Sequence, residues 1–307
     1  MKRNIVLDCD PGHDDAVAIL LAGKSDKINL LGISTASGNQ TIEKTTRNTI
    51  NICRYLGINV PIAKGSPRPL VQKSMICPEI HGESGLDGFD FPEYGQTIDA
   101  RSGAQLIIDC VMNNDDVTVI TTGPMTNLGL AMRLEPKIIQ RIKEVIFMGG
   151  SIDHGNVSPA AEFNILVDPE AAYIVATSGV PMKMIGLNVT RQVAVDDEII
   201  ERMRKVNNGA SKMFCDLMRV FLDNQRNTFG VKAAPLHDPV TIASILDPNC
   251  VKFEKMNLQI DISHGPSYGR TNCDVFDYLK LPKNCDVAIA IDQNRFWDVI
   301  EKGLREY

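Results

Sequence analysis

The chain has 307 residues, of which 44% are hydrophobic and 23% are charged, and its formal net charge is -6. This composition is typical of a globular protein and excludes a disordered or fibrous chain. The negative charge gives no electrostatic reason to expect binding to nucleic acid or to an anionic membrane surface. A small polar ligand is therefore the first expectation.

The amino-terminal residues do not resemble a secretory signal. Their apolar run is only Ile5, Val6 and Leu7 before Asp8 interrupts it. No apolar run in the sequence approaches the roughly 20 residues that span a bilayer. We expect a cytoplasmic protein that does not bind a membrane.

Short apolar runs alternate along the chain with longer segments of helical period. The runs NIVLD, INLLGIST, VTVITT and EVIFMGG are each followed by a helix-like segment. This alternation predicts a single-domain, Rossmann-like α/β fold over residues 1–307, with a mostly parallel central sheet and helices on both faces. Residues 195–229 are predicted to be wholly helical, and the runs after residue 251 predict late strands, some of them antiparallel.

Four aspartates follow the first strand-like run. Asp8, Asp10, Asp14 and Asp15 lie within eight positions, and the Pro-Gly pair between them predicts a tight turn into a helix. The carboxylates should therefore gather at the carboxyl edge of a parallel sheet, where open α/β folds bind ligands.

A divalent cation explains this concentration of charge. Asp14 and Asp15 could complement a helix N-terminus, an effect of roughly 0.3 to 1 kcal/mol each, but that leaves Asp10 unexplained. Oxygen ligands favour Mg²⁺ or Ca²⁺ over zinc. An EF-hand is excluded, because a loop that opens at Asp8 would need Glu where Ile19 stands. We interpret the cluster as half of a hard-metal site.

Residues 64–100 contain little periodic sequence and are rich in glycine and proline. A loop of this length inside a compact domain is usually functional or disordered. We predict an active-site flap over residues 64–100.

Two later segments could complete the metal site. TTGPMTN at 121–127 is a strand end whose carbonyls could bind the ion, and PLHDP at 235–239 contains His237 and Asp238. Taken alone, the His-Asp pair is more often a helix cap than a site.

Seven motifs in order resemble the inosine-uridine nucleoside hydrolases. They are DCDPGHDD at 8–15, SGNQ at 37–40, IHGESGLDG at 80–88, TGPMTNL at 122–128, FMGG at 147–150, AEFNILVDPEAA at 161–172, and PLHDP. The likeness is greatest to bacterial pyrimidine-preferring members. It implies hydrolysis of the N-glycosidic bond of ribonucleosides, with uridine and cytidine preferred and inosine as an alternative, by a homotetramer or homodimer.

The resemblance also implies a bound Ca²⁺ and its ligands. These are Asp10, Asp15, the main-chain carbonyl of Thr122, and Asp238. Asp10 would also take a proton from the attacking water, and His237 would act as the donor to the leaving base.

The other matched positions would hold the nucleoside. Asp14 and Asn39 match residues that bind the ribose hydroxyls, and His81 is predicted to contact the base or the sugar. The positions matched around the 5′-hydroxyl are Met148, Asn156, Glu162 and Asn164. An extended backbone would direct Glu162 and Asn164 to the same ligand, since they are two residues apart. By itself, Asn156 would be interpreted as a turn residue.

The segment NQRNTFG at 224–230 limits the prediction of base preference. It matches a base-contacting helix in which pyrimidine-preferring relatives can present Gln and Tyr, and here Gln225 is present but Phe229 stands at the tyrosine position. Phe can stack on a base but has no hydroxyl for hydrogen bonding.

Two other functions compete with this interpretation. A phosphatase of the haloacid-dehalogenase type would use Asp8 as nucleophile and Asp10 as acid, but its motif expects Thr or Val where Gly12 stands. A non-catalytic, Ca²⁺-dependent nucleoside-binding protein would keep the metal and sugar residues without needing Asp10 or His237.

Overall fold

A mostly parallel sheet forms the centre of the computed structural model, which describes residues 2–95 and 97–307. Its strands run in the order β3-β2-β1-β4-β5-β6-β12-β9, and only β9 is antiparallel to its neighbour. Their bounds are β1 Arg3–Cys9, β2 Ile28–Thr35, β3 Ile62–Lys64, β4 Val117–Thr121, β5 Ile142–Met148, β6 Met182–Ile185, β9 Val251–Met256 and β12 Cys285–Ile291. This single-domain arrangement confirms the predicted fold class.

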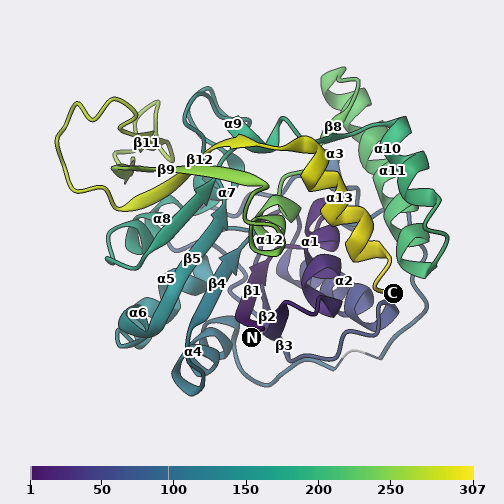
Figure 1. The fold of residues 1–307 in the computed structure, drawn as a ribbon. Helices are drawn as coiled ribbons and strands as arrows, with labels where there is room; N and C mark the ends of the chain where they lie inside the picture. The colour runs from purple at the N-terminus through teal and green to yellow at the C-terminus, as the bar shows by residue number, and fades with distance from the viewer. Residues whose placement is uncertain (1, 96) are drawn as a thin grey trace.

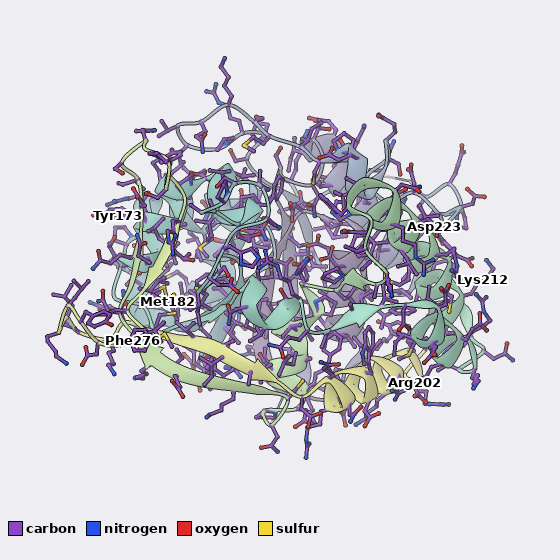
Figure 2. The ribbon with its side chains drawn as sticks, turned by 90° about the horizontal axis from the view of Figure 1, so that it is seen from above. Tyr173, Met182, Arg202, Lys212, Asp223 and Phe276 are labelled. Carbon is purple, nitrogen blue, oxygen red and sulfur yellow. The ribbon has the colours of Figure 1, made fainter. Side chains whose placement is uncertain are left out.

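Helices cover both faces of the sheet (Figure 1). One buried core joins the sheet to α1 (His13–Lys24), α2 (Ile42–Tyr55), α11 (Gly209–Phe229), α12 (Pro239–Leu246) and α13 (Gln293–Leu304). The other involves α4 (Gly103–Asn113), α5 (Thr126–Leu134), α6 (Ile138–Arg141) and α8 (Pro169–Ala176). Figure 2 shows Tyr173 of α8 and Lys212 of α11 at opposite sides of the molecule. Among the described residues, no helix is long and apolar enough to cross a membrane.

The central position of β1 explains its sequence. Ile5, Val6 and Leu7 are fully buried, because neighbouring strands flank β1 on both edges and helices cover both of its faces. The chain then turns at Pro11 and enters α1, which is buried from His13 to Ala22 because α12 and α13 also pack against it. The aspartates of this turn are consequently placed inside the protein.

The prediction that residues 195–229 are wholly helical is wrong, because Val195 belongs to a strand and a turn divides the rest. α10 (Asp197–Arg204) ends before a turn in which Asn207 has a positive φ of 58°. Asparagine tolerates this left-handed conformation. Asn208 then caps α11, since its Oδ1 accepts a hydrogen bond from the Ser211 amide at 2.8 Å. A local turn therefore separates two helices whose apolar period is continuous in the sequence.

The late strands are confirmed, including an antiparallel ribbon formed by β10 (Leu258–Ile260) and β11 (Thr271–Cys273). A second small pair consists of β7 (Ala194–Val195) and β8 (Ala234–Pro235). Short helices complete the chain: α3 Pro78–His81, α7 Phe163–Val167 and α9 Leu187–Thr190.

Part of the 64–100 segment is attached to the turn after β1. The side-chain amide of Asn48, on α2, donates to the carbonyl of Pro11 at 3.2 Å and to that of Ser84 at 3.0 Å. Gln40 donates from its Nε2 to the Gly82 carbonyl at 3.2 Å. These contacts place α3 beside the aspartates. A flap function for residues 64–100 stays a prediction.

Candidate active site

A cavity of about 510 Å³ lies at the carboxyl ends of β1, β4 and β5. Most of the residues predicted to bind substrate or metal line it, and they come from distant parts of the chain. They are Asp14, Asn39, His81, Thr122, Met148, Asn156, Glu162, Asn164, Gln225, Phe229, His237 and Asp238. The two remaining predicted residues, Asp10 and Asp15, are fully buried and do not belong to the lining.

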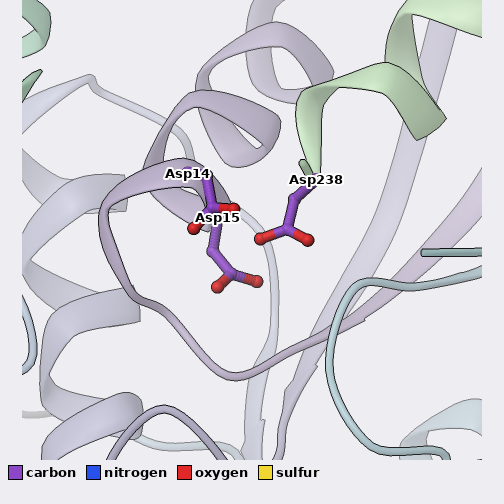
Figure 3. A group of neighbouring side chains, drawn as sticks. All are labelled: Asp14, Asp15 and Asp238. Atoms are coloured by element: carbon purple, nitrogen blue, oxygen red, sulfur yellow. The ribbon is translucent and has the colours of Figure 1, made fainter. Parts of the chain in front are cut away.

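Three carboxylates, which we call the floor of the cavity, lie together (Figure 3), and two of them, Asp14 and Asp238, belong to its lining. Asp14 and Asp15 come from the first turn of α1, and Asp238 directly precedes α12. One carboxylate oxygen from each lies within 4.8 Å of the others, and all three side chains are buried. The resemblance implied Asp10, Asp15, Thr122 and Asp238 as metal ligands, and the structure brings Asp14, which the resemblance assigned to the ribose hydroxyls, together with Asp15 and Asp238.

The Asp10 carboxylate lies beside this group in a narrow slot. Its Oδ2 accepts a hydrogen bond from the main-chain amide of Asn39 at 2.7 Å, whereas its Oδ1 is buried without a hydrogen-bond partner among the described residues. A Cβ atom on Gly38 would lie 2.1 Å from Oδ2, and one on Gly123 would lie 2.5 Å from Oδ1. Glycine is therefore required at both positions to admit the carboxylate.

Hydrogen bonds fix the Asp15 side chain. Its Oδ2 accepts from the Gly12 amide and from Nδ2 of Asn39, each at 3.1 Å, and its Oδ1 accepts from the Thr122 hydroxyl at 2.7 Å. Donors on three separate segments therefore hold one carboxylate in place. Such restraint is expected of a metal ligand whose orientation is set by the surrounding residues.

Burial disfavours the ionised forms of Asp10, Asp14, Asp15 and Asp238. It raises the pKa of Asp14 to about 7, with the charge of Asp15 as the next cause. It also raises the pKa of Asp10 and of Asp238 well above the ordinary value, and that of Asp15 above it. A cation would offset this cost. The clustered oxygens and the unpartnered Oδ1 of Asp10 fit a hard divalent ion such as Ca²⁺ or Mg²⁺.

The His-Asp pair does not act as a helix cap. Asp238 occupies the position before α12, yet its side chain makes no capping hydrogen bond. Instead, its carboxylate faces those of Asp14 and Asp15. The alternative interpretation of this pair is therefore not supported by the structure.

The prediction of an extended backbone at Glu162 and Asn164 is wrong. Glu162 caps α7, since its carboxylate accepts from the amides of Asn164 and Ile165 at 2.9 and 3.2 Å. The short helix that begins after this cap replaces the extended backbone that the two-residue spacing suggested. Both side chains still line the cavity, and Nδ2 of Asn164 donates to the Thr122 carbonyl at 2.7 Å.

Two histidines also line the cavity. Nδ1 of His81 accepts a hydrogen bond from the His13 amide at 3.2 Å, and the His81 ring stacks on Phe221 with centroids 5.8 Å apart. Nδ1 of His237 lies 2.7 Å from the Thr190 hydroxyl. Burial lowers the pKa of His237 to about 4 and that of His81 well below its ordinary value, so both rings are neutral at pH 7.

Several residues of the cavity were not predicted from the sequence. Arg191 follows α9 and donates to the Gly155 carbonyl at 2.7 Å, which joins two segments of the rim. Phe221 has the spacing of an ordinary core residue of α11, and Cys77 precedes α3. Arg191 could have been found from its place after β6, because other parallel strands end at the same edge.

The chain is similar along almost its whole length to known nucleoside hydrolases. A family model described as inosine-uridine preferring nucleoside hydrolase matches residues 5–298. A pyrimidine-specific ribonucleoside hydrolase, RihB of Shigella sonnei, is 43% identical over 307 residues, which cover 100% of this chain and 98% of that protein.

Solved structures share the fold. A purine-preferring ribonucleoside hydrolase from Gardnerella vaginalis has a TM-score of 0.91 and 32% identity, and the alignment covers 99% of each chain. A plant nucleoside hydrolase, PpNRh1, has a TM-score of 0.93 and 26% identity, again over 99% of each chain.

The slot around Asp10 gives a first prediction. Gly38→Ala should displace the Asp10 carboxylate and weaken Ca²⁺ binding by at least about tenfold, because the new methyl group overlaps Oδ2. Calorimetric titration with Ca²⁺ measures this. Gly265→Ala is the matched control, since a Cβ there has only the Ser263 hydroxyl within 4 Å, at 3.9 Å. Equal affinity in both variants would contradict the assignment of Asp10 to the cation site.

Proposed function

The chain belongs to the inosine-uridine preferring nucleoside hydrolase family, and from this premise we propose that it is a Ca²⁺-dependent hydrolase of pyrimidine ribonucleosides that releases ribose and the free base. The observation that carries the proposal is the buried carboxylate group of Asp14, Asp15 and Asp238 at the floor of a cavity large enough for a nucleoside.

The preference for pyrimidines is supported by the full-length likeness to a pyrimidine-specific relative. Two residues of the cavity can contact the base of a pyrimidine or a purine nucleoside. Gln225 is buried on the cavity side of α11 and offers an amide that can hydrogen-bond a base. Phe229, which is 58% exposed at the end of the same helix, offers a ring for stacking.

The residues that would hold the cation are Asp10, Asp15, Asp238 and the carbonyl of Thr122, with Asp14 beside them. When bound, Ca²⁺ would supply positive charge and Lewis acidity, which lower the pKa of a coordinated water. Asp14 and Asn39 would hold the ribose hydroxyls. Cation and sugar would thus share one buried floor.

The chain's own groups would perform the remaining steps. Asp10 would take a proton from the attacking water, because its Oδ1 is unpartnered while Oδ2 is held by the Asn39 amide. Cleavage of the N-glycosidic bond places positive charge on the ribose, which nearby carboxylates stabilise. His237 would donate a hydrogen to the leaving base, and His81 would contact the base or the sugar.

The 5′ end of the nucleoside would lie near Met148, Asn156, Glu162 and Asn164, which line one side of the cavity. The Glu162 carboxylate also accepts a hydrogen bond from the Gly150 amide at 2.9 Å, so its position is fixed before substrate arrives. Anchoring the sugar at several points orients C1′ toward the water.

The competing functions are less well supported. Family membership favours a nucleoside hydrolase over a phosphatase of the haloacid-dehalogenase type and over a non-catalytic binding protein.

A direct test incubates the protein and excess Ca²⁺ with uridine, cytidine, inosine or adenosine and measures free ribose. We expect kcat/KM to be highest for uridine and cytidine and to fall to background after chelation. A higher value for inosine would remove the pyrimidine preference. Absence of ribose from all four nucleosides would contradict the proposed function.

The second test concerns Asp10. Asp10→Asn should lower kcat for uridine by at least about 100-fold at saturating Ca²⁺, because the amide cannot accept the proton of the water. Calorimetry establishes the Ca²⁺ concentration that saturates each protein. If the variant turns over at a near-normal rate, Asp10 is not the base.

The pKa shifts predict how Ca²⁺ and pH together affect stability. In the cation-free protein the pKa of Asp14 rises from 3.8 to about 7, so the folded state holds the Asp14 proton more tightly than the unfolded state does. The stability that this proton contributes is fully present below the unfolded pKa and is lost as pH rises through about 7. Ca²⁺ binds carboxylates only in their ionised form.

Addition of Ca²⁺ should therefore raise Tm more at about pH 8 than at about pH 5. Thermal unfolding with and without Ca²⁺ at both pH values measures the difference. The same increase at both values would show that the buried aspartates do not bind the ion.

A further inference from the structure

We propose that Thr190 is a positioning residue that fixes the tautomer of His237, so that Nε2 carries the ring hydrogen and presents it to the leaving base. The part of the proposal that concerns the base rests on the proposed function. The part that concerns the tautomer depends on the protein alone.

The contact between the two residues is short and buried. Thr190 is the last residue of α9, and its side chain is 0% exposed. Its Oγ1 lies 2.7 Å from Nδ1 of His237. At this distance one of the two atoms donates a hydrogen bond to the other.

The surroundings of the hydroxyl decide which atom donates. The Gly186 carbonyl, one turn earlier, already accepts from the amides of Val189 and Thr190, at 3.1 and 3.2 Å. Within the described part of the chain, Nδ1 of His237 is the one hydrogen-bond partner of the Thr190 hydroxyl. If Nδ1 carried a hydrogen, the hydroxyl hydrogen would be buried without an acceptor, which is costly. The hydroxyl therefore donates, so Nδ1 carries no hydrogen and the ring hydrogen resides on Nε2.

The backbone holds this contact in place. β7 and β8 pair just beyond it, with Ala194 opposite Pro235, and the Leu236 amide donates to the Val193 carbonyl at 2.8 Å. The His237 amide also points to Oδ2 of Asp14, at 3.4 Å. The segments that follow Thr190 and precede His237 are thus joined by main-chain hydrogen bonds next to the side-chain contact.

The tautomer matters because the base leaves with the electron pair of the N-glycosidic bond. Charge then develops on the base, and an N–H donor stabilises it, whereas an unprotonated ring nitrogen would repel it. His237 lines the cavity, and Nε2 has no hydrogen-bond partner among the described residues. Thr190 would accordingly act only through His237, without touching the substrate.

The first experiment observes the tautomer directly. Ring ¹⁵N spectra of the full-length protein with Ca²⁺ distinguish protonated from unprotonated nitrogens, and the chain has only five histidines to assign. We expect an Nε2–H ring at His237 in the wild type and a mixture of tautomers in Thr190→Val, which has the same shape but no hydroxyl. A wild-type ring with its hydrogen on Nδ1 would overturn the proposal, whatever the protein hydrolyses.

The second experiment measures the consequence for catalysis. Thr190→Val should lower kcat for uridine about tenfold and leave KM within about twofold, while a nitrophenyl riboside, whose leaving group needs no donor, changes by less than about twofold. Thr190→Ser keeps the hydroxyl and should restore uridine turnover. An equal loss on both substrates, or no restoration by Ser, would assign Thr190 a merely structural role.

Discussion

The repulsion among buried carboxylates is the constraint on which the site depends. Asp10, Asp14, Asp15 and Asp238 are each at most 5% exposed, and burial raises the pKa of every one of them. A fold tolerates such a group only if something favours the charged state when the protein works. The slot between Gly38 and Gly123 shows that the chain is shaped to keep a carboxylate there rather than to remove it.

Sheet topology explains how residues so far apart in sequence reach this group. Parallel strands end at one edge, so the segments after β1, β2, β4 and β5 deliver the DPGHDD turn, Asn39, Thr122 and Met148 to the same cavity. Asp238 arrives from a different part of the chain, because α12 packs against α1 and starts beside its first turn. The floor is consequently built from the buried first turn of α1 and the residue that precedes α12.

Motif order predicted most of the residues that line the cavity. The resemblance implied Asp15 and Asp238 as metal ligands, and the structure brings their carboxylates together with that of Asp14. Arg191 and Phe221 were missed, since one lies in a short unpatterned segment and the other has the period of a core helix. The break between α10 and α11 was also missed, because a local turn at Asn207 does not disturb the apolar repeat.

The floor of the cavity and the wall that contains residues of α11 and α3 have different structural origins. The floor is formed by the first turn of α1 and the residue that precedes α12, whereas Gln225 and Phe229 belong to the end of α11, and His81 to the short α3. The histidines are oriented by groups beside the cavity: the His13 amide holds Nδ1 of His81 and the Thr190 hydroxyl holds Nδ1 of His237. Side chains of α11, α3 and α9 can therefore vary while the sheet and the carboxylates remain the same, which allows one fold to accept different ligands.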